Sequence, residues 1–297
     1  MIYLTSFCLP DDSTEQDFYL NYPHELESAF YSGSVYPFKI FPEKELTTLS
    51  LDTITIFYGG NGSGKSTLLN IIAEKLGVPR SSPYSKAPCL AAYLERCRYR
   101  FSPTVSSLPR DSRIVTSDDV FDYLLNVRAI NEGLDRRRES LLAEYHNYTD
   151  PAKPSYRLGS LEDYEELRRR NEARHRTQSA YVSRRLPTDL TSRSNGESAL
   201  VWFQKQIGEN ALYLLDEPEN SLSAELQLRL KQFIEDSARF YGCQFILATH
   251  SPFLLSLKNA TIYNLDARPA TVQPWTELPN VRLWFDFFQQ HQQEFDD

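Results

Sequence analysis

The sequence has no run of about 18 apolar residues, the length a helix needs to cross a bilayer. Its first eight residues, MIYLTSFC, also lack the basic region and long apolar core of a secretion signal, and they are typical of a first strand. Positive charge is scarce as well: 32 Lys and Arg residues face 40 Asp and Glu residues, which gives a net charge of −8. We therefore expect a cytoplasmic protein without a membrane span that does not coat nucleic acid in general.

Cysteine is also rare, and its copies are scattered. The four are Cys8, Cys89, Cys97 and Cys243, with no Cys-x-x-Cys pair. This spacing fits neither a disulfide framework nor a zinc site, and it indicates buried, reduced thiols. The aromatic share, by contrast, is high at 13%. It predicts a Tyr- and Phe-rich core or partner surface.

One glycine-rich segment carries a lysine and hydroxyl side chains at a fixed spacing. The apolar run 54–58 leads into residues 59–67, and a helical pattern over 68–73 follows. This is G-x-x-x-x-G-K-[ST] in a strand–loop–helix setting, the P-loop that cradles phosphates. A plain glycine turn would leave the lysine and serine unexplained. The residues expected to bind nucleotide here are Gly59, Gly60, Asn61, Gly62, Ser63, Gly64, Lys65, Ser66 and Thr67.

The chemistry of these groups indicates a nucleoside triphosphate, which we take to be ATP. Backbone N–H groups of the loop and the positive end of the following helix would face the phosphate oxygens. Lys65 would reach the β- and γ-phosphates, and the Ser66 hydroxyl would bind Mg2+.

A second apolar run, over residues 212–215, ends in Asp216 and Glu217. In this Walker B pattern, Asp216 would hold Mg2+ and Glu217 would deprotonate the attacking water. An isolated run of this kind is equally typical of an ordinary strand end, but the upstream P-loop favours the metal site. His250 follows the apolar run 245–249, so it would emerge at the same sheet edge and contact the γ-phosphate and the water. A lone histidine is otherwise usually structural.

The remaining pattern alternates strands and helices. Expected strands cover 35–41, 113–116, 211–215, 244–248 and 261–265, and a closing helix is expected over 283–295. The near-continuous apolar runs at 211–215 and 244–248 indicate strands covered on both faces. Between them, Leu226, Leu230 and Ile234 line one face of a helix.

Residues 120–193 form a polar, helix-prone block in which the positive charge is concentrated. Between 168 and 193, two acidic residues face the arginines Arg168, Arg169, Arg170, Arg174, Arg176, Arg184, Arg185 and Arg193. A solvated helical arm with its own ion pairs would explain this charge. A surface for nucleic acid or for an acidic partner would explain it as well.

Residues 194–198, Ser-Asn-Gly-Glu-Ser, open a helical run over 199–203 about twenty residues before Asp216. Small residues and free N–H groups at a helix start form an anion site. The same residues would also serve as a simple helix cap.

The ordered set of P-loop, Ser-Asn-Gly-Glu-Ser, Leu-Leu-Asp-Glu-Pro-Glu-Asn-Ser-Leu-Ser and Ala-Thr-His-Ser-Pro resembles the ATP-binding-cassette (ABC) ATPases. Within that superfamily, the chain is most similar to small soluble bacterial ABC-type ATPases, which are also described as AAA-family proteins. The resemblance implies an α/β P-loop NTPase fold of the ABC-ATPase type, with a mixed sheet, flanking helices and a helical insertion. It implies one ATPase domain over 1–297, with 120–193 as the Arg-rich insertion.

The resemblance also implies a composite site. By analogy, Ser194, Asn195, Gly196 and Glu197 fall on the signature motif, residues 220–223 on the D-loop, and His250 on the switch histidine. In such proteins, the signature of one subunit completes the P-loop site of the other. We therefore expect a head-to-tail homodimer that encloses two ATP molecules.

The sequence departs from the family pattern in two places. Arg193, Asn195 and Glu197 replace residues of the usual Leu-Ser-Gly-Gly-Gln signature, and no Q-loop glutamine follows the strand at 113–116. Asp118 is the candidate for the missing metal or water contact. Tyr36 and Phe38 are candidates for stacking on the adenine, and each is equally compatible with a buried aromatic side chain.

The leading hypothesis is a soluble, Mg-ATP-hydrolysing ATPase whose ATP-dependent dimerisation regulates a partner protein or a nucleic-acid process, as in bacterial anti-phage systems. The alternative is a nucleic-acid clamp of the SMC and Rad50 type that uses the Arg-rich block, although the block is too short for their coiled coil. The departures from the usual signature sequence argue against the ATPase subunit of a membrane transporter. The sequence shows no nuclease motif, so effector chemistry would come from a partner.

Overall fold

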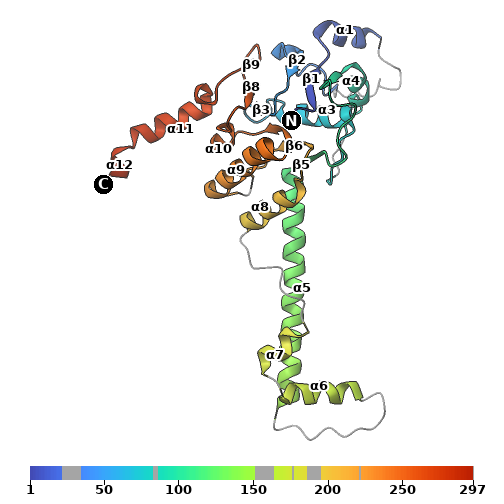
Figure 1. The fold of residues 1–297 in the computed structure, drawn as a ribbon, viewed down its shortest axis with the longest axis vertical. Helices are drawn as coiled ribbons and strands as arrows, with labels where there is room; N and C mark the ends of the chain where they lie inside the picture. Colours follow the sequence, from blue (N-terminus) through green and yellow to red (C-terminus); the bar gives the residue numbers. More distant parts are fainter. Residues whose placement is uncertain are drawn as a thin grey trace. The chain divides into compact units, whose positions relative to one another are not determined.

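The computed structural model describes residues 1–21, 35–82, 86–150, 164–175, 177–185, 195–220 and 222–296 (Figure 1). The chain divides into two compact units, one formed by residues 1–120 together with 196–297, and the other by residues 121–195. The interpretation of 120–193 as an insertion within a single ATPase domain stays a prediction.

The first unit is built on a six-stranded sheet with the strand order β5-β6-β7-β3-β8-β9. Its strands are β3 (Ile54–Tyr58), β5 (Arg113–Thr116), β6 (Leu212–Asp216), β7 (Gln244–Ala248), β8 (Thr261–Asn264) and β9 (Thr271–Val272). Neighbouring strands pair in parallel, except that β9 is antiparallel to β8. Every residue of β3 and β7 is buried, as expected for strands covered on both faces. The α/β fold with a mixed sheet is therefore confirmed.

A smaller antiparallel sheet in the same unit has the order β2-β1-β4 and comprises β1 (Leu4–Cys8), β2 (Thr48–Ser50) and β4 (Arg98–Phe101). The buried side chain of Gln244 links this sheet to the start of β7. Its Oε1 accepts hydrogen bonds from the N–H groups of Tyr3 and Leu4, at 2.8 and 2.9 Å, and its Nε2 donates to the Leu4 carbonyl at 2.8 Å. A buried amide is costly without such partners, so Gln244 fixes how the two sheets meet.

The first unit also contains the helices α1 (Asp12–Leu20), α3 (Lys65–Leu76), α4 (Leu90–Arg96), α8 (Asn195–Gln206), α9 (Ala224–Phe240), α10 (Pro252–Leu255), α11 (Pro279–Gln290) and α12 (Gln293–Asp296), with the 3-10 turns η2 (Pro42–Lys44) and η4 (Trp275–Glu277). Of these, α3 and α9 pack against the larger sheet, whereas α11 and α12 project away from it (Figure 1). Helix α9 buries Leu226, Leu230 and Ile234, and Ser223 caps its first turn by accepting from Leu226 N–H. The amphipathic helix expected between β6 and β7 is confirmed.

The second unit contains most of α5 (Ser117–Thr149), together with α6 (Tyr164–His175) and α7 (Gln178–Ser183). It has a small core of its own formed by Leu141, Ala173, Tyr181 and Val182. The Tyr181 hydroxyl donates to Glu144 at 2.8 Å and so satisfies its polar end in this core.

Ion pairs within the second unit involve four of the arginines between 168 and 193. The pairs are Arg170 with Glu166 at 2.8 Å, Arg185 and Arg184 with Glu172 at 2.7 and 3.5 Å, and Arg169 with Glu144 at 3.9 Å. Arg176, Arg193 and the side chain of Arg174 lie outside the described residues. The contacts that are described favour the ion-paired arm, and nucleic-acid binding by this stretch stays a prediction.

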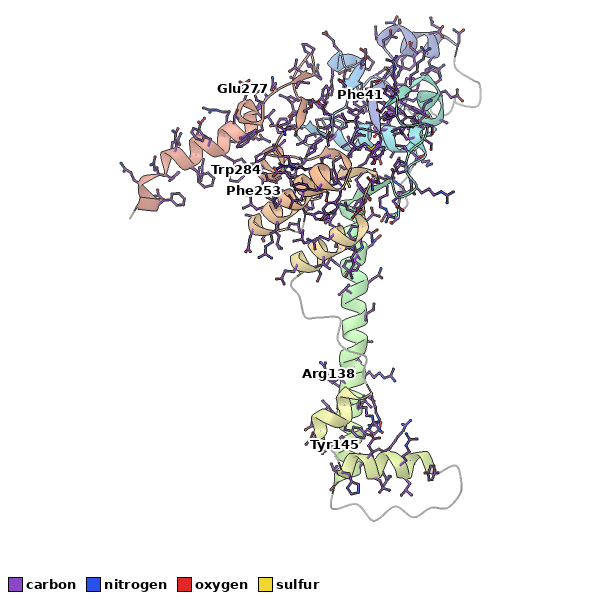
Figure 2. The ribbon with its side chains drawn as sticks, viewed as in Figure 1. Phe41, Arg138, Tyr145, Phe253, Glu277 and Trp284 are labelled. Carbon is purple, nitrogen blue, oxygen red and sulfur yellow. The ribbon has the colours of Figure 1, made fainter. Side chains whose placement is uncertain are left out.

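The strand predicted over 35–41 is wrong. These residues form a turn that runs into η2, and Lys39 and Glu45 have φ angles of 71° and 53°. Pro37 and Pro42 have no N–H to donate to a strand partner, which disfavours a central strand here. Phe38 and Phe41 are instead buried in the core of the unit (Phe41 is labelled in Figure 2).

The closing helix expected over 283–295 is present as α11 and α12. Val281 is buried, whereas Leu283, Trp284, Phe285, Phe287 and Phe288 are exposed (Trp284 is labelled in Figure 2). Part of the high aromatic content therefore lies on a surface rather than in the core. No helix in the described part of the chain is long and apolar enough to cross a membrane.

Candidate nucleotide-binding site

The loop between β3 and α3 has the backbone geometry of an anion cradle. Gly62 and Gly64 have φ angles of 78° and 96°, values that side chains other than glycine adopt only with strain. A Cβ atom on Gly59 would lie 2.5 Å from Ser63 Oγ, so glycine is required there as well. Ser63 Oγ is buried and has no hydrogen-bond partner among the described residues. A tight loop with an unsatisfied hydroxyl at the start of a helix fits a phosphate group.

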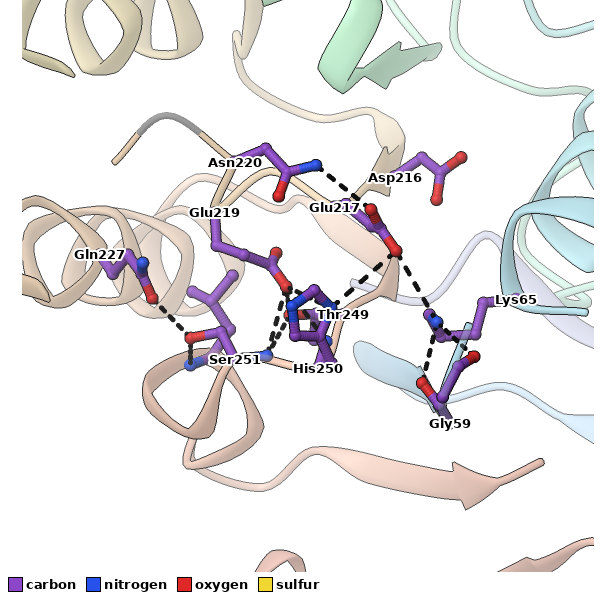
Figure 3. A network of polar contacts seen from close by, with 12 residues as sticks. Gly59, Lys65, Asp216, Glu217, Glu219, Asn220, Gln227, Thr249, His250 and Ser251 are labelled. Atoms are coloured by element: carbon purple, nitrogen blue, oxygen red, sulfur yellow. Dashed lines mark hydrogen bonds and ion pairs between the residues drawn. The ribbon is translucent and has the colours of Figure 1, made fainter. Parts of the chain in front are cut away.

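Lys65 lies inside this loop and is only 5% exposed. Its Nζ donates to the carbonyls of Gly59 and Gly60, at 2.8 and 3.0 Å, and lies 3.7 Å from Glu217 Oε1 (Figure 3). The two hydrogen bonds have neutral acceptors, so a phosphate oxygen would make a stronger, charge-assisted bond with the same ammonium. The position and charge of Lys65 therefore suit a nucleotide phosphate.

The hydroxyl and the carboxylate expected to bind magnesium are in direct contact. Ser66 Oγ donates to Asp216 Oδ1 at 2.9 Å. Burial raises the pKa of Asp216 to about 6, and Glu217 contributes to this rise, while the Ser66 hydrogen bond and the Lys65 charge oppose it. Oxygen ligands on adjacent elements fit a Mg2+ ion that is also held by water and phosphate.

Glu217 and His250 meet beside this pair, as expected from strand ends at one sheet edge. Glu217 N–H donates to the Ala248 carbonyl at 2.9 Å, which ties the ends of β6 and β7 together. Glu217 Oε1 lies 3.9 Å from His250 Nδ1, and Oε2 accepts from Asn220 at 3.2 Å (Figure 3). With Lys65 on its other side, the Glu217 carboxylate lies between two basic groups.

Glu219 is a site residue that the sequence reasoning missed. Its side chain is 5% exposed, and its Oε1 accepts from Thr249 Oγ1 at 2.5 Å and from the N–H groups of His250 and Ser251 at 3.1 and 3.2 Å. The third carboxylate in Asp-Glu-Pro-Glu was the available signal. Asp266 was missed as well, and its Oδ2 accepts from the Gly60 N–H at 2.8 Å. No sequence pattern around Asp266 indicates this contact.

A cavity of about 310 Å3 adjoins Ser66 and Asp216. Its lining also includes Glu217, Asp118 and Arg80. Asp118 therefore lies where a Q-loop contact was expected, although its role stays a prediction. The neighbouring Asp119 has a structural role, because its carboxylate accepts from the N–H groups of Thr116 and Ser82, at 2.8 and 2.7 Å.

The signature residues are only partly described. Ser194 lies outside the described residues, and so does the side chain of Asn195, where α8 begins. Gly196 and Glu197 are in the first turn of α8, and they do not line the cavity beside Ser66. In the D-loop, Ser221 lies outside the described residues. A role for this segment at a site on another subunit stays a prediction.

The two adenine-stacking candidates have different environments. Phe38 is 3% exposed and stacks on Phe18 with ring centroids 4.3 Å apart, so it belongs to the core and the candidate is wrong. Tyr36 is 44% exposed, and its hydroxyl lies 2.6 Å from Thr67 Oγ1. Tyr36 therefore remains the candidate for the adenine.

The mixed sheet, the P-loop and the paired carboxylates define an α/β P-loop nucleotide-binding fold. Residues 54–256 match the family described as "AAA domain, putative AbiEii toxin, Type IV TA system". Because the match spans more than half of the chain, the protein belongs to this family. A search among curated proteins finds no match.

Similar solved structures include three that have low identity to the chain. One is "an inward-facing conformation of a putative metal-chelate type ABC transporter", with 19% identity over 79% of this chain and 76% of that one and a TM-score of 0.37. Another is an SmcHead bound to the C-winged helix domain of ScpA, with 17% identity, 76% and 92% coverage, and a TM-score of 0.38. A third is a nucleotide-free ATP-binding cassette from an ABC transporter, with 14% identity, 74% and 81% coverage, and a TM-score of 0.34.

Proposed function

We propose that the protein is a Mg2+-dependent ATPase whose ATP-bound form is a head-to-tail homodimer. One observation carries this proposal: Lys65, Ser66, Asp216, Glu217 and His250 converge at the carboxyl ends of β3, β6 and β7. Ligands of open α/β sheets bind at this edge. Phosphoryl transfer needs held phosphates, neutralised charge and a base for the water, and these five side chains supply the corresponding groups.

Each side chain has a distinct role in this proposal. Lys65 would exchange its carbonyl partners for phosphate oxygens, and Ser66 and Asp216 would hold a Mg2+ ion, which would supply positive charge beside the phosphates. Glu217 accepts the proton of the attacking water through a carboxylate that Asn220 orients. His250, at 48% exposure, is accessible to the γ-phosphate.

The other half of the site comes from a second copy of the chain. There, Ser194, Asn195, Gly196 and Glu197 at the start of α8 would contact the nucleotide bound to the first copy. The N–H groups of a first helical turn have no carbonyl partner within the helix, which suits contact with an anion. ATP would then favour the closed dimer, and hydrolysis would open it.

The output of this cycle is proposed to be the control of a partner in the bacterial cytoplasm, as in anti-phage defence. The family description, which names a toxin of a type IV toxin–antitoxin system, is compatible with that role. The alternative is a nucleic-acid clamp that uses the stretch 168–193. It has weaker support than the partner-control role, because Arg170 and Arg185 in this stretch already pair with glutamates.

Phosphate release from ATP tests the enzymatic part of the proposal. The wild-type protein should hydrolyse ATP with Mg2+ and not with excess EDTA. Lys65→Ala should reduce the rate by at least about 100-fold, because it removes a cation that faces the transferring phosphoryl group. Lys86→Ala is the matched control, since Lys86 is exposed and pairs with Glu74 at 2.6 Å. Equal rates for Lys65→Ala and the wild type would contradict the assignment.

A further inference from the structure

The turn that carries His250 is held by one buried carboxylate. Glu219 Oε1 accepts three hydrogen bonds, all from the consecutive residues Thr249, His250 and Ser251 (Figure 3). Its other oxygen, Oε2, is buried and has no hydrogen-bond partner in the described part of the chain. Within the described residues, the hydrogen bonds that this carboxylate accepts therefore all come from this turn.

The energetic consequence is that Glu219 and the turn depend on each other. A buried carboxylate is stable only when donors compensate for the lost water. Two of its donors are backbone N–H groups, so the carboxylate fixes the path of the main chain at His250 rather than only a side chain. A shift of Glu219 would therefore move the imidazole.

One nitrogen of the His250 imidazole, Nδ1, lies near two carboxylates. His250 Nδ1 lies 3.6 Å from Glu219 Oε1 and 3.9 Å from Glu217 Oε1. Negative oxygens on this side favour a proton on Nδ1. In a neutral ring, Nε2 is then an acceptor.

We propose that Glu219 is a positioning residue for ATP hydrolysis, one that fixes the turn at His250 and favours the Nδ1-protonated tautomer. Nε2 is thereby left for the nucleotide or the attacking water. This inference rests on the proposed ATPase function and adds to it a residue that acts through His250.

A second anchor limits the effect of changing Glu219. Ser251 Oγ donates to Gln227 Oε1 at 2.7 Å, and Gln227 Nε2 donates to the Leu222 carbonyl at 3.0 Å. Helix α9 therefore holds the far end of the turn without Glu219. Loss of the carboxylate should misplace His250 without releasing the whole segment.

Steady-state kinetics of three Glu219 variants test the positioning role. Glu219→Ala should lower kcat by about 10- to 100-fold, the usual effect of misplacing a catalytic group, with KM for ATP within about twofold. Glu219→Asp, whose shorter side chain cannot reach the same donors, should lose as much. Glu219→Gln keeps an acceptor oxygen for the turn but loses the negative charge beside Nδ1, so its kcat should fall, but by less than that of Glu219→Ala. The matched control is Glu225→Gln, an exposed glutamate on α9 that should leave kcat unchanged.

A double-mutant cycle shows whether Glu219 acts through His250. If it does, Glu219→Ala should change the rate of a His250→Ala protein by less than about twofold. If the double variant instead loses the product of the two single-variant reductions in rate, the proposal is overturned. An unchanged kcat in folded Glu219→Ala and Glu219→Asp proteins would overturn it as well.

The tautomer is measured without turnover, by NMR of the nucleotide-free protein with 15N-labelled histidine. His250 should be protonated on Nδ1 in the wild type and should lose that preference in Glu219→Ala or Glu219→Asp. An identical tautomer population in the wild type and these variants would refute the role of Glu219. Absence of hydrolysis by the wild type would instead refute the proposed ATPase function, so the two failures are distinguishable.

Discussion

Replacement of Glu217 by Gln removes the proposed base and changes little else. The side chains have nearly the same shape, and an amide oxygen at the Oε2 position would still accept from Asn220 Nδ2, now at 3.2 Å. Because the carboxylate is 26% exposed and lies at the surface of the site, loss of its charge should not unfold the protein. The variant therefore isolates the chemical step.

The size of the effect follows from the contacts of Glu217. A positioned general base contributes about 100- to 10,000-fold to a rate, which corresponds to about 3 to 5 kcal/mol of transition-state free energy. Glu217 Oε1 is also 3.7 Å from Lys65 Nζ, so its loss leaves the lysine more available to phosphate. We expect kcat to fall by about 100-fold or more, while the affinity for ATP is unchanged or higher.

The assay pairs phosphate release under saturating Mg-ATP with titration of a fluorescent ATP analogue. Asp236→Asn, on the exposed side of α9, is a control for loss of a negative charge elsewhere. A kcat within about threefold of the wild type would refute Glu217 as the base. A large loss of ATP affinity would show that Glu217 has a binding role instead.

Two further predictions concern the fold that supports the site. Gly64→Ala should lower the free energy of unfolding by about 1 to 3 kcal/mol in urea titrations, because φ is 96° at this position and the new Cβ would lie 3.2 Å from Ile40; an unchanged midpoint would contradict it. Burial raises the pKa of Glu15 from 4.5 to about 7, although a hydrogen bond from the Lys39 N–H acts to lower that pKa. Since the folded protein holds this proton more tightly than the unfolded chain, its contribution to stability should be largest below pH 4.5 and should fall as the pH rises through 7, by up to about 3 kcal/mol. Glu15→Gln should flatten that decline and raise stability at pH 8, and a pH profile unaltered by the substitution would contradict the reasoning.

The sequence was sufficient to predict the elements whose signal is local. The apolar runs of β3, β6 and β7 are buried on both faces, so their composition alone distinguishes them from surface strands. Parallel pairing then brings the carboxyl ends of β6 and β7, with Asp216 and His250, to one edge of the sheet, next to the P-loop. The expected site residues in these three segments could be placed for that reason.

The features that were missed depend on contacts between distant segments. The stretch 35–41 is rich in the apolar and aromatic residues typical of a strand, but packing of Phe38 against Phe18 and Tyr93 decides its conformation. Glu219 was identified only as part of a motif, because its partners follow another strand thirty residues later. The arginines of the second unit could not be paired with Glu144 and Glu172 until the helices were placed. Tertiary packing, rather than local propensity, determined each of these outcomes.

The central claim is that ATP closes a dimer around composite sites, and the mass of the Glu217→Gln protein in solution tests it most directly. Light scattering should give the monomer mass of 34.4 kDa without nucleotide and twice that mass with Mg-ATP. Glu217→Gln combined with Lys65→Ala should remain monomeric under both conditions, since it cannot hold the phosphates. A hydrolysis-deficient protein that binds ATP and still has the monomer mass, or the same mass with and without ATP, would contradict the account.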